Sequence, residues 1–390
     1  MEGDFVKINP WLIPFSWIYG AGVNIRNFLF DWKILRSKSF DLPVISVGNI
    51  TVGGSGKTPH VEYLIRLLQD KYRVAVLSRG YKRRSKGFIL ADAKHRIEDV
   101  GDEPYQLKKK FGQIHVAVDA DRCHGIETLR SLSETKDTQV ILLDDAYQHR
   151  YVKPGINILL VDYHRLIIYD RLLPAGRLRE PKESKSRADI VIVTKCPHDM
   201  TSMDYRVIKK ALDLYPYQML LFSSIDYGRL QPMYCGGSRT LSSITKKENI
   251  LLLTGIASPE QLLLDLQPYT KNITHLSFPD HHQFTNDDLE TINTTFAEMP
   301  SPKTIITTEK DAARLFGMKG LNEQTRHHLY ILPIKIKFMQ EGEEIFNQKI
   351  LNYVRENTRN SGLAQEQDDN QPQDSHHSGN GIRTISFRNN

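Results

Sequence analysis

The sequence has few cysteines and no long hydrophobic run. Cys123, Cys196 and Cys235 are its three cysteines, and they do not have the spacing of metal ligands. We therefore expect neither a disulfide framework nor a cysteine-based zinc site, and a reducing, cytosolic compartment fits best. Residues 11–20 are aromatic and apolar, but this run is too short to span a bilayer and lacks the basic flank of a signal peptide.

The remaining composition is that of an ordinary globular protein with a mild excess of positive charge. The chain has 390 residues, is 40% hydrophobic and 25% charged, and carries a formal net charge of +6. This length allows two domains with cores of their own. The positive charge suits anionic partners, and membrane surface, nucleotide and nucleic acid all fit it at this point.

The most informative motif is a glycine-rich turn between a strand-like and a helix-like segment. Residues 48–59 read Gly-Asn-Ile-Thr-Val-Gly-Gly-Ser-Gly-Lys-Thr-Pro, after the apolar run 42–47 and before the helical pattern of 60–68. In this context backbone N–H groups can converge on a phosphate at the start of a helix. The motif predicts a phosphate-binding loop in which Lys57 reaches the outer phosphates and Thr58 binds Mg²⁺ through its hydroxyl.

One position of this loop departs from the usual pattern. Thr51 stands where glycine is usual, separated from the Gly-Lys pair by four residues. Gly53 and Gly54 can supply the positive φ angles instead. The alternative is a glycine-rich turn that contains a lysine by chance, and the flanking strand and helix argue against it.

Two pairs of neighbouring carboxylates follow or begin predicted elements. Asp144 and Asp145 end the apolar run 139–143, where a carboxylate beside a phosphate loop can hold Mg²⁺. We favour Asp144 as the ligand, and Asp145 as a second ligand or as part of proton handling. Asp102 and Glu103 begin a helical segment, where one could act as a base and the other face the metal. The alternative for both pairs is ordinary helix capping or turn formation.

Cationic and polar side chains follow other strand-like runs. They are candidates for binding the phosphate of a second substrate, although any one of them alone is more often a surface residue: Arg79, Arg122, Gln148, His149, Arg177 and Arg179. In the second half of the chain, His281 stands beside Asp280 in a loop that follows a predicted strand. The sequence therefore predicts a polar, cationic site at the carboxyl ends of several strands.

The order of elements predicts an α/β fold with a mainly parallel sheet flanked by helices, followed by a smaller α/β domain. The strand-like runs of the first half alternate with helical segments, and several lack polar alternation, as in strands covered on both faces: 44–47, 74–77, 114–118, 140–143, 156–161 and 190–193. Two further strand-like runs, 219–225 and 330–338, bracket the second unit and could join the domains.

We accordingly divide the chain into segments by composition and pattern. A core domain occupies 41–217, a smaller α/β domain 218–340, a C-terminal helix 341–358, and a polar tail, expected to be disordered, 359–390. Residues 1–40 combine aromatic and apolar side chains with lysine and arginine. This pattern suits a helix in a membrane interface or a helix packed on the protein's own core, and the residues alone do not choose between them.

Taken together, these motifs resemble those of the tetraacyldisaccharide 4'-kinase family. The resemblance is carried, in the order of the chain, by 48–59, Ser-Arg-Gly-Tyr at 78–81, Gly-Asp-Glu-Pro at 101–104, Asp-Asp-Ala-Tyr-Gln-His-Arg at 144–150, Leu-Pro-Ala-Gly-Arg-Leu-Arg-Glu at 173–180 and Asp-His-His at 280–282. It extends from residue 11 to about 340, and a phosphate loop with threonine at position 51 is the family's own form.

The resemblance implies a P-loop kinase of lipid A biosynthesis in Gram-negative bacteria. Its reaction would transfer the γ-phosphoryl group of ATP to the 4'-hydroxyl of a tetraacyldisaccharide 1-phosphate and give lipid IVA. It also implies peripheral attachment to the cytoplasmic face of the inner membrane, which favours a membrane-docking role for residues 1–40. The expected partners are ATP, the lipid A disaccharide 1-phosphate and the membrane surface, and no nucleic acid.

The resemblance also implies roles for individual residues. The ATP-binding loop would comprise Thr51, Val52, Gly53, Gly54, Ser55, Gly56, Lys57 and Thr58, with Lys57 on the β- and γ-phosphates. Thr58, Asp144 and Glu103 would handle Mg²⁺. Asp102 would act as the general base, oriented by His281 rather than His282, and Asp145 would assist. Arg79, Arg122, Gln148, His149 and Arg177 would contact phosphates or the headgroup.

Two other functions compete with the kinase. A P-loop GTPase or ATPase switch is suggested by Thr-Lys-Cys-Pro at 194–197, which begins like a guanine-specificity motif, but Pro197 stands where that motif requires aspartate. A basic nucleic-acid-binding ATPase would need an aromatic and basic recognition motif that the sequence does not contain. Both alternatives are therefore weaker than the kinase.

Overall fold

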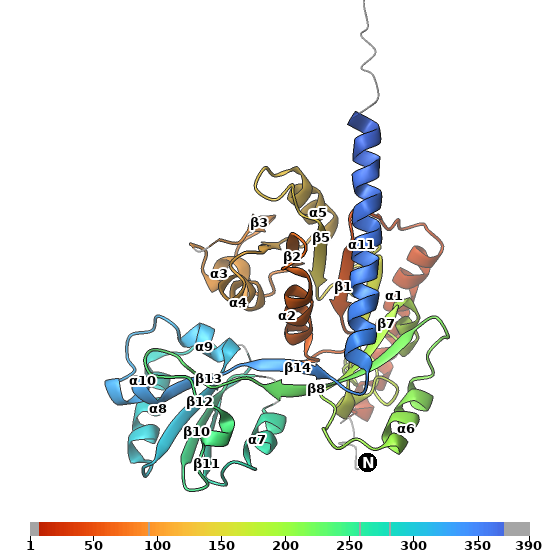
Figure 1. Ribbon diagram of the computed structural model, residues 1–390. Helices are drawn as coiled ribbons and strands as arrows, with labels where there is room; N and C mark the ends of the chain where they lie inside the picture. Colours follow the sequence, from red (N-terminus) through yellow and green to blue (C-terminus); the bar gives the residue numbers. More distant parts are fainter. Residues whose placement is uncertain (1–7, 93, 257–258, 281, 370–390) are drawn as a thin grey trace, which may run out of the picture.

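Two β-sheets organise the chain in the computed structural model, which describes residues 8–92, 94–256, 259–280 and 282–369 (Figure 1). The strands of the larger sheet are β1 (Val44–Gly48), β2 (Val74–Ser78), β3 (Ile89–Leu90), β4 (His115–Val118), β5 (Val140–Asp144), β6 (Ile156–Asp162), β7 (Ile190–Thr194), β8 (Met219–Tyr227) and β14 (Ile334–Phe338). Their spatial order is β14-β8-β7-β6-β1-β5-β2-β4-β3. From β8 to β4 all neighbours are parallel, and only the edge strands β3 and β14 pair antiparallel.

Helices cover both faces of this sheet, as expected for a parallel sheet. They are α2 (Lys57–Leu68), α3 (Ile97–Val100), α4 (Asp102–Lys110), α5 (Arg122–Ser131) and α6 (Ser202–Leu212), with short 3-10 turns at Tyr163–Arg165 and Lys182–Arg187. Successive residues of β5 face opposite sides. Leu142 packs in the same cluster as Val61 of α2, whereas Ile141 packs in the cluster that contains Ile126 of α5. Burial on both sides explains why β5 shows no polar alternation.

The second unit contains the smaller sheet. Its strands β9 (Gln231–Pro232), β10 (Asn249–Thr254), β11 (Ile273–Ser277), β12 (Lys303–Thr308) and β13 (Leu329–Leu332) are arranged in the order β11-β10-β12-β13-β9. The accompanying helices are α7 (Glu260–Leu266), α8 (Asn286–Glu298), α9 (Glu309–Leu315) and α10 (Glu323–His328), with a 3-10 turn at Leu241–Ser243. Separate apolar clusters lie on the two faces of this sheet, so the unit has its own core.

The two units are joined by β8 and β14. The first residues of β8 pair with β7, and its later residues pair antiparallel with β14, so a two-stranded ribbon leaves the larger sheet and leads to the second unit (Figure 1). The predicted strand 219–225 falls within β8, whereas the predicted strand 330–338 is divided into β13 of the smaller sheet and β14 of the ribbon. The ribbon brings α9 of the second unit against α4 of the first.

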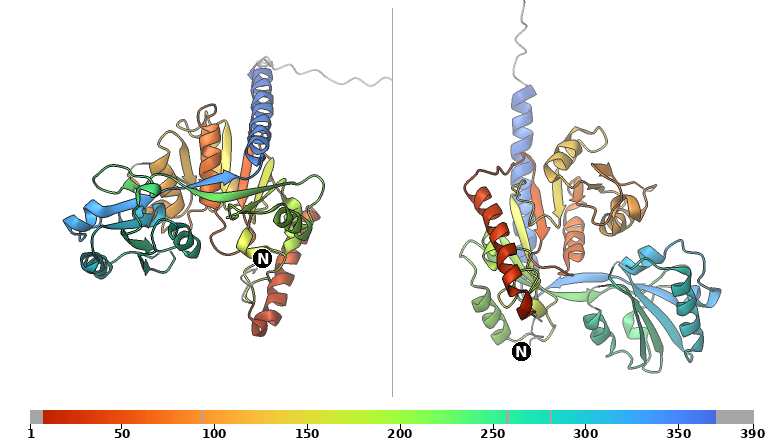
Figure 2. Two further views of the ribbon diagram at one scale, coloured as in Figure 1. Left: turned by 60° about the horizontal axis from the view of Figure 1, so that its bottom comes forward. Right: turned by 180° about the vertical axis from the view of Figure 1, so that it is seen from behind.

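The terminal helices lie on the outside of the larger unit. After a short turn at Pro10–Leu12, α1 (Ile13–Asp31) lies on the side away from the second unit (Figure 2). None of the helices in the described ranges has the length and apolar character needed to cross a membrane.

The last helix, α11 (Gly342–Asp369), begins against the sheet and then projects away from it (Figure 1). Phe346, Ile350 and Val354 anchor its first turns in the core. The helix continues beyond residue 358, where the sequence analysis ended it, because Ala364 and the glutamine and glutamate residues around it favour helix. The remainder of the tail, residues 370–390, lies outside the described part of the chain.

Candidate active site

The glycine-rich loop joins β1 to α2 at the carboxyl edge of the larger sheet. Gly53 and Gly56 have φ angles of 118° and 81°, in a region that residues with a Cβ rarely enter. The prediction of a positive φ was right for Gly53 and wrong for Gly54, whose place is taken by Gly56. These angles turn the chain so that α2 begins at Lys57. Ser55 Oγ is buried in the loop and has no hydrogen-bond partner among the described residues. A buried polar atom without a partner in such a loop fits a phosphate site.

Asp144 lies beside this loop because β5 is a neighbour of β1. It pairs in register with Val47, it is 4% exposed, and its Oδ1 has no hydrogen-bond partner in the described part of the chain. Burial, followed by the charges of Glu103 and Asp145, raises the pKa of Asp144 to about 7. A divalent cation would offset the negative charge of this acidic cluster, so these residues fit an Mg²⁺ site.

Asp145 is held between two cations. Its Oδ1 lies 3.6 Å from Lys57 Nζ and 3.1 Å from Arg179 Nη2. Burial raises the pKa of Asp145, but Lys57 and then Arg179 outweigh burial, so the pKa lies below its ordinary value. Asp145 is therefore ionised and holds Lys57 close to the carboxyl end of β5. Of the two arginines noted in this loop, Arg179 reaches the site, whereas the side chain of Arg177 is exposed.

The remaining carboxylates, Asp102 and Glu103, form the first turn of α4 and contact the second unit. Arg314 Nη2 donates to Asp102 Oδ2 at 2.6 Å, and Lys310 Nζ donates to Glu103 Oε1 at 2.9 Å. Both cations lie on α9. Lys310 and Arg314 are not among the residues predicted from the sequence, because neither follows a strand of the larger sheet and their partners are distant in the sequence.

His281, the residue expected to orient Asp102, lies outside the described residues. Its neighbours are described. The charge of Asp280 acts on Lys310 and helps to raise the pKa of that lysine. His282 Nε2 lies 2.8 Å from Asp288 Oδ2, and its ring stacks on Phe278, so His282 is bound within the second unit.

Arg122 is the most deeply buried of the cationic candidates. It is 2% exposed, and its Nη1 donates to the carbonyl oxygens of Asp119 and Ala120, each at 3.1 Å. Burial lowers the pKa of Arg122 to about 10, while the charges of Asp144 and Asp145 oppose this shift. Even so, Arg122 stays charged at neutral pH. Its electrostatic link to Asp144 places a buried cation beside the acidic cluster.

Gln148 connects the site to the N-terminal helix. The side-chain Nε2 of Gln148 donates to the backbone oxygen of Asn49 at 2.5 Å. The backbone carbonyl oxygen of Gln148 accepts from Arg26 Nη2 of α1 at 2.8 Å. The Tyr19 hydroxyl of the same helix donates to Arg179 O at 2.9 Å. The helix α1 therefore packs directly on the loops that carry the candidate site.

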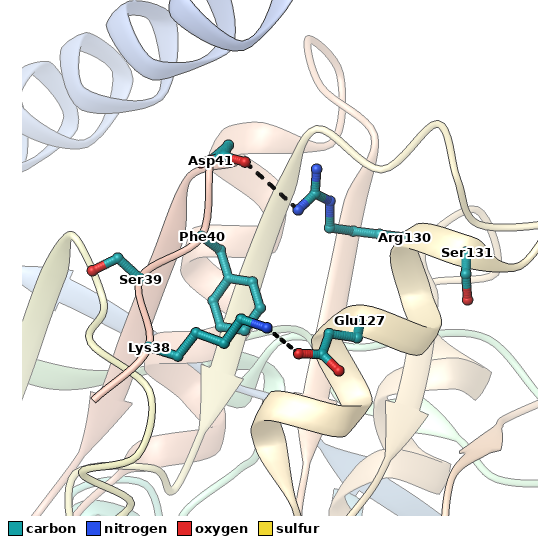
Figure 3. Close-up of a pocket in the computed structure, with 7 residues that line it drawn as sticks. All are labelled: Lys38, Ser39, Phe40, Asp41, Glu127, Arg130 and Ser131. Atoms are coloured by element: carbon teal, nitrogen blue, oxygen red, sulfur yellow. Dashed lines mark hydrogen bonds and ion pairs between the residues drawn. The ribbon is translucent and has the colours of Figure 1, made fainter. Parts of the chain in front are cut away.

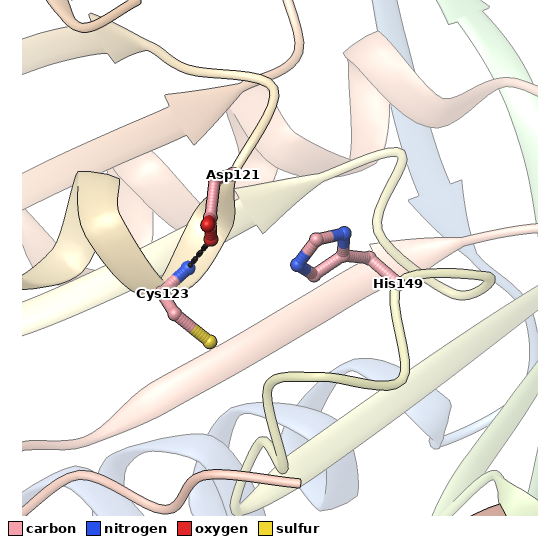
Figure 4. Close-up of side chains that lie close together, drawn as sticks. All are labelled: Asp121, Cys123 and His149. Atoms are coloured by element: carbon pink, nitrogen blue, oxygen red, sulfur yellow. Dashed lines mark hydrogen bonds between the residues drawn. The ribbon is translucent and has the colours of Figure 1, made fainter. Parts of the chain in front are cut away.

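His149 lies in a small cluster with Asp121 and Cys123 (Figure 4). One ligand-type atom from each of these residues lies within 4.8 Å of the others. Burial, followed by the charge of Arg122, lowers the pKa of His149 to about 4, so the imidazole is neutral. Because Arg26 and Arg79 add further positive charge, this surrounding disfavours a metal cation. We therefore interpret Asp121, Cys123 and His149 as residues that pack beside these arginines.

Two surface hollows lie at different distances from the carboxyl edge of the larger sheet. A hollow of about 390 Å³ follows the end of β2 and is lined by Arg79 and basic residues of the next loop, including Lys82 and Arg83. A second hollow, of about 330 Å³, lies beside the segment that precedes β1 (Figure 3). Ion pairs cross it from Lys38 to Glu127 and from Arg130 to Asp41. Only the first is at the carboxyl edge, where ligands of such sheets bind.

Comparison with known proteins identifies the family of this chain. The family model described as tetraacyldisaccharide-1-P 4'-kinase matches residues 8–355. The chain belongs to this kinase family. A curated tetraacyldisaccharide 4'-kinase from Phocaeicola vulgatus is 58% identical over 366 residues, which cover 93% of this chain and 100% of the relative. Its counterpart from Flavobacterium johnsoniae is 48% identical over 346 residues, covering 89% of this chain and 97% of the relative.

A solved structure of the kinase family agrees with the fold. The "apo" form of LpxK from Aquifex aeolicus, in complex with ATP, is 31% identical and aligns with a TM-score of 0.66 over 88% of this chain and 98% of that chain. The family relationship and the α/β fold with a P-loop-type parallel sheet, both expected from the sequence, are thereby confirmed. The weaker expectation of a GTPase or ATPase switch finds no support in this family membership.

Proposed function

We propose that this protein transfers the γ-phosphoryl group of ATP to the 4'-hydroxyl of tetraacyldisaccharide 1-phosphate and gives lipid IVA. The observation that carries the proposal is that the phosphate loop, the acidic pair after β5 and the carboxylates of α4 meet at one edge of the sheet. Glu103 acts electrostatically on Asp144, and Asp145 contacts Lys57. This combination supplies a phosphate cradle, a cation site and a base, as phosphoryl transfer requires.

ATP would bind along residues 51–58. Lys57 would contact the β- and γ-phosphates, as a cation at the start of α2. Thr58, Asp144 and Glu103 would hold Mg²⁺, which when bound neutralises negative charge on the phosphates. Ser55 Oγ and Asp144 Oδ1, which have no hydrogen-bond partner among the residues that the structure describes, support both assignments, because each is a buried polar atom that such a ligand would satisfy.

Asp102 would accept the proton of the sugar hydroxyl. A carboxylate at the start of α4 can orient a hydroxyl for in-line attack, and the proton moves to its oxygen as the P–O bond forms. His281 would orient Asp102 from the second unit, and Asp145 would act through Lys57. We also propose that the chain is divided into a core domain, 41–217, and a smaller domain, 218–340. Asp102 then lies in the core domain, and the residues of the second unit that contact it lie in the smaller domain.

The disaccharide would bind at the carboxyl edge of the larger sheet, near its arginine side chains. Arg79, Arg122, Gln148, His149 and Arg177 are the proposed contacts to its phosphate and headgroup. Arg122 is the strongest of these candidates because it is buried beside the acidic cluster, and a guanidinium binds phosphate oxygens in a bidentate manner.

The helix α1 would attach the protein to the cytoplasmic face of the inner membrane. Large apolar side chains are exposed along it, and Trp17 is 72% exposed. Lys33 and Arg36 are exposed just after the helix, where they could meet lipid phosphates. Because α1 also contacts Gln148, attachment through this helix would place the candidate site close to the surface that holds the lipid substrate.

Transfer of label from γ-³²P-ATP to purified tetraacyldisaccharide 1-phosphate tests the proposed reaction. We expect a labelled lipid product that requires both the acceptor and Mg²⁺. Hydrolysis of ATP or GTP at a rate independent of the acceptor would contradict the proposal and would favour a nucleotide switch. Asp102→Asn should abolish transfer while nucleotide binding is retained, and near-normal transfer by this variant would exclude Asp102 as the base.

A further inference from the structure

The helices α4 and α9 are joined by a row of ion pairs across the boundary between the two units. Lys110 Nζ lies 2.5 Å from Glu309 Oε1, at the end of α4 and the start of α9. At the other end of the row, Arg314 Nη2 lies 2.6 Å from Asp102 Oδ2. The two helices are therefore antiparallel. We call this contact, with the pair between Glu103 and Lys310, the α4–α9 seam.

The two ends of the α4–α9 seam lie at different distances from the candidate catalytic residues. The pair of Lys110 and Glu309 joins the helices where no candidate catalytic group lies, and Lys110 also contacts Glu62 of α2. The pairs at the other end involve the proposed base and a proposed metal ligand. The seam therefore offers a structural contact and an active-site contact on the same helix, which can be varied separately.

Arg314 is held in place by its own unit before it reaches Asp102. Its side chain is 1% exposed, and its Nη1 donates to Gly255 O at 3.2 Å and to Asp311 Oδ1 at 3.1 Å. Asp311 is itself fixed, because its Oδ2 accepts from Thr308 Oγ1 at 2.7 Å and from the backbone N–H of Gly255 at 3.0 Å. The guanidinium is thus presented to α4 from a rigid, buried support.

We propose that Arg314 is a positioning residue for phosphoryl transfer, which holds the Asp102 carboxylate in the orientation that accepts the proton of the sugar hydroxyl. This inference rests on the proposed role of Asp102 as the base. By donating to Oδ2, Arg314 fixes the rotation of the carboxylate.

The nature of the transition state explains why orientation matters here more than base strength. Phosphoryl transfer passes through a loose transition state, so the protein contributes mainly by positioning the reacting groups and by stabilising charge. Loss of the fixed orientation of Asp102 should therefore slow transfer strongly. Because Arg314 belongs to the second unit, the base is oriented only when α9 rests on α4.

Other charged groups belong to the same part of the seam. Lys310 of α9 pairs with Glu103 of α4, Asp311 of α9 pairs with Arg314, and the charge of Asp280, in the loop after β11, acts on Lys310. Asp144 at the end of β5 interacts electrostatically with Glu103. Among these groups, Arg314 donates directly to the Asp102 carboxylate.

The experiment compares Arg314→Gln and Arg314→Lys with Glu309→Gln in the full-length protein. We expect Arg314→Gln to lower kcat about 100-fold with the KM for ATP changed less than about twofold, because only orientation of the base is lost. Glu309→Gln removes a charge from the same seam and should leave kcat within about twofold of the native protein.

Arg314→Lys tests the same role of Arg314 if the Arg314→Gln variant does not fold. A lysine preserves a positive charge near Asp311, but a single ammonium cannot reproduce the fork that joins Asp311, Gly255 and Asp102. We expect a folded protein, verified by its thermal transition, with kcat lowered about 10-fold and a nearly native KM for ATP. A folded lysine variant with native kcat would overturn the inference, as would an increase in kcat.

A double-mutant cycle separates this inference from the proposed base. If Arg314 acts through Asp102, Arg314→Gln should have almost no effect on the residual rate of Asp102→Asn. If Asp102→Asn abolishes transfer and Arg314→Gln in the native background does not reduce it, the role of Arg314 is wrong and that of Asp102 stands. If Asp102→Asn retains near-native transfer, the proposed base itself is wrong, and the positioning role falls with it.

Discussion

Lys57 Nζ lies 3.6 Å from Asp145 Oδ1, so the phosphate loop and the strand β5 are joined by an ion pair. The same carboxylate oxygen lies 3.1 Å from Arg179 Nη2. Asp145 therefore holds Lys57 close to the position where the outer phosphates of a nucleotide would lie. This arrangement keeps the lysine oriented before a ligand arrives, which lowers the reorganisation that binding requires.

Replacing Lys57 should abolish most of the transfer activity. We expect Lys57→Ala to lower kcat at least about 100-fold, because a preorganised charge that stabilises the transferring phosphoryl group is lost. Activity measured with labelled ATP tests this expectation, and Lys71→Ala, at an exposed lysine beyond the end of α2, is the matched control. Near-native kcat in Lys57→Ala, with the native fold retained, would remove Lys57 from the site.

The stability of the nucleotide-free protein should depend on pH through Asp144. Its pKa is raised by burial from 3.8 to about 7 in the folded state. The folded protein therefore binds more protons than the unfolded chain in this window, so the free energy of unfolding should fall as pH rises from about 4 to about 7. The contribution of Asp144 is at most about 4 kcal/mol. Urea unfolding of the native protein and Asp144→Asn at pH 5 and pH 8 measures it, and the variant should be less sensitive to pH.

Glu62 provides the control for this measurement. Burial raises its pKa from 4.5 to about 7, so it contributes a dependence of the same sign. Glu62→Gln should therefore also flatten the pH dependence of stability, but it should leave phosphoryl transfer nearly unchanged, whereas Asp144→Asn should abolish it. Mg²⁺ should reduce the pH dependence of Glu62→Gln and not that of Asp144→Asn. An Asp144→Asn protein with the native pH dependence would show that Asp144 is not the group that titrates.

Arg122 should affect the lipid substrate more than ATP. We expect Arg122→Gln to raise the KM for the disaccharide 1-phosphate about 10-fold or more, because a buried guanidinium that pairs with a phosphate is lost. The KM for ATP should change much less. Arg130→Gln is the matched control, since Arg130 lies on the same helix α5 and faces the hollow at the opposite edge (Figure 3). Equal changes in both KM values would argue against a specific lipid contact.

The exposed face of α1 should determine membrane attachment. Trp17→Glu should weaken partitioning onto vesicles that contain anionic lipid about 10-fold, because a large apolar side chain can no longer enter the interface. Sedimentation with vesicles provides the measurement. Met203→Glu, at another exposed apolar residue on α6, is the control and should bind as the native protein does. Unchanged partitioning of Trp17→Glu would favour a purely structural role for this helix.

Much of the larger unit could be predicted because its signals are local. A buried parallel strand needs a short apolar run, and a phosphate loop needs glycines directly after such a strand, so β1, the loop and α2 are all visible within residues 42–68. The positions of Asp144 and Asp145 followed from the same reasoning. The end of α11 was harder to place, since the composition after residue 358 favours both helix and solvated coil.

The candidate site is less predictable where its residues come from different units. Arg179 and Arg177 belong to one loop, and only their packing decides that Arg179 contacts Asp145. Lys310 and Arg314 lie in a segment that reads as an ordinary charged helix. Lys310 and Arg314 contact α4 only because the ribbon of β8 and β14 places α9 against α4. No local sequence pattern encodes this placement.

The sequence by itself determined the phosphate loop, the acidic pair after β5, the parallel α/β class and the kinase family, because each depends on residues close together in the chain. The tertiary structure decided which charges meet. Asp102 and Arg314 are 212 positions apart, yet their side chains are 2.6 Å apart once the two units pack together. Ion pairs act over a few ångströms in space and do not depend on separation along the chain, so only the packed fold can select them.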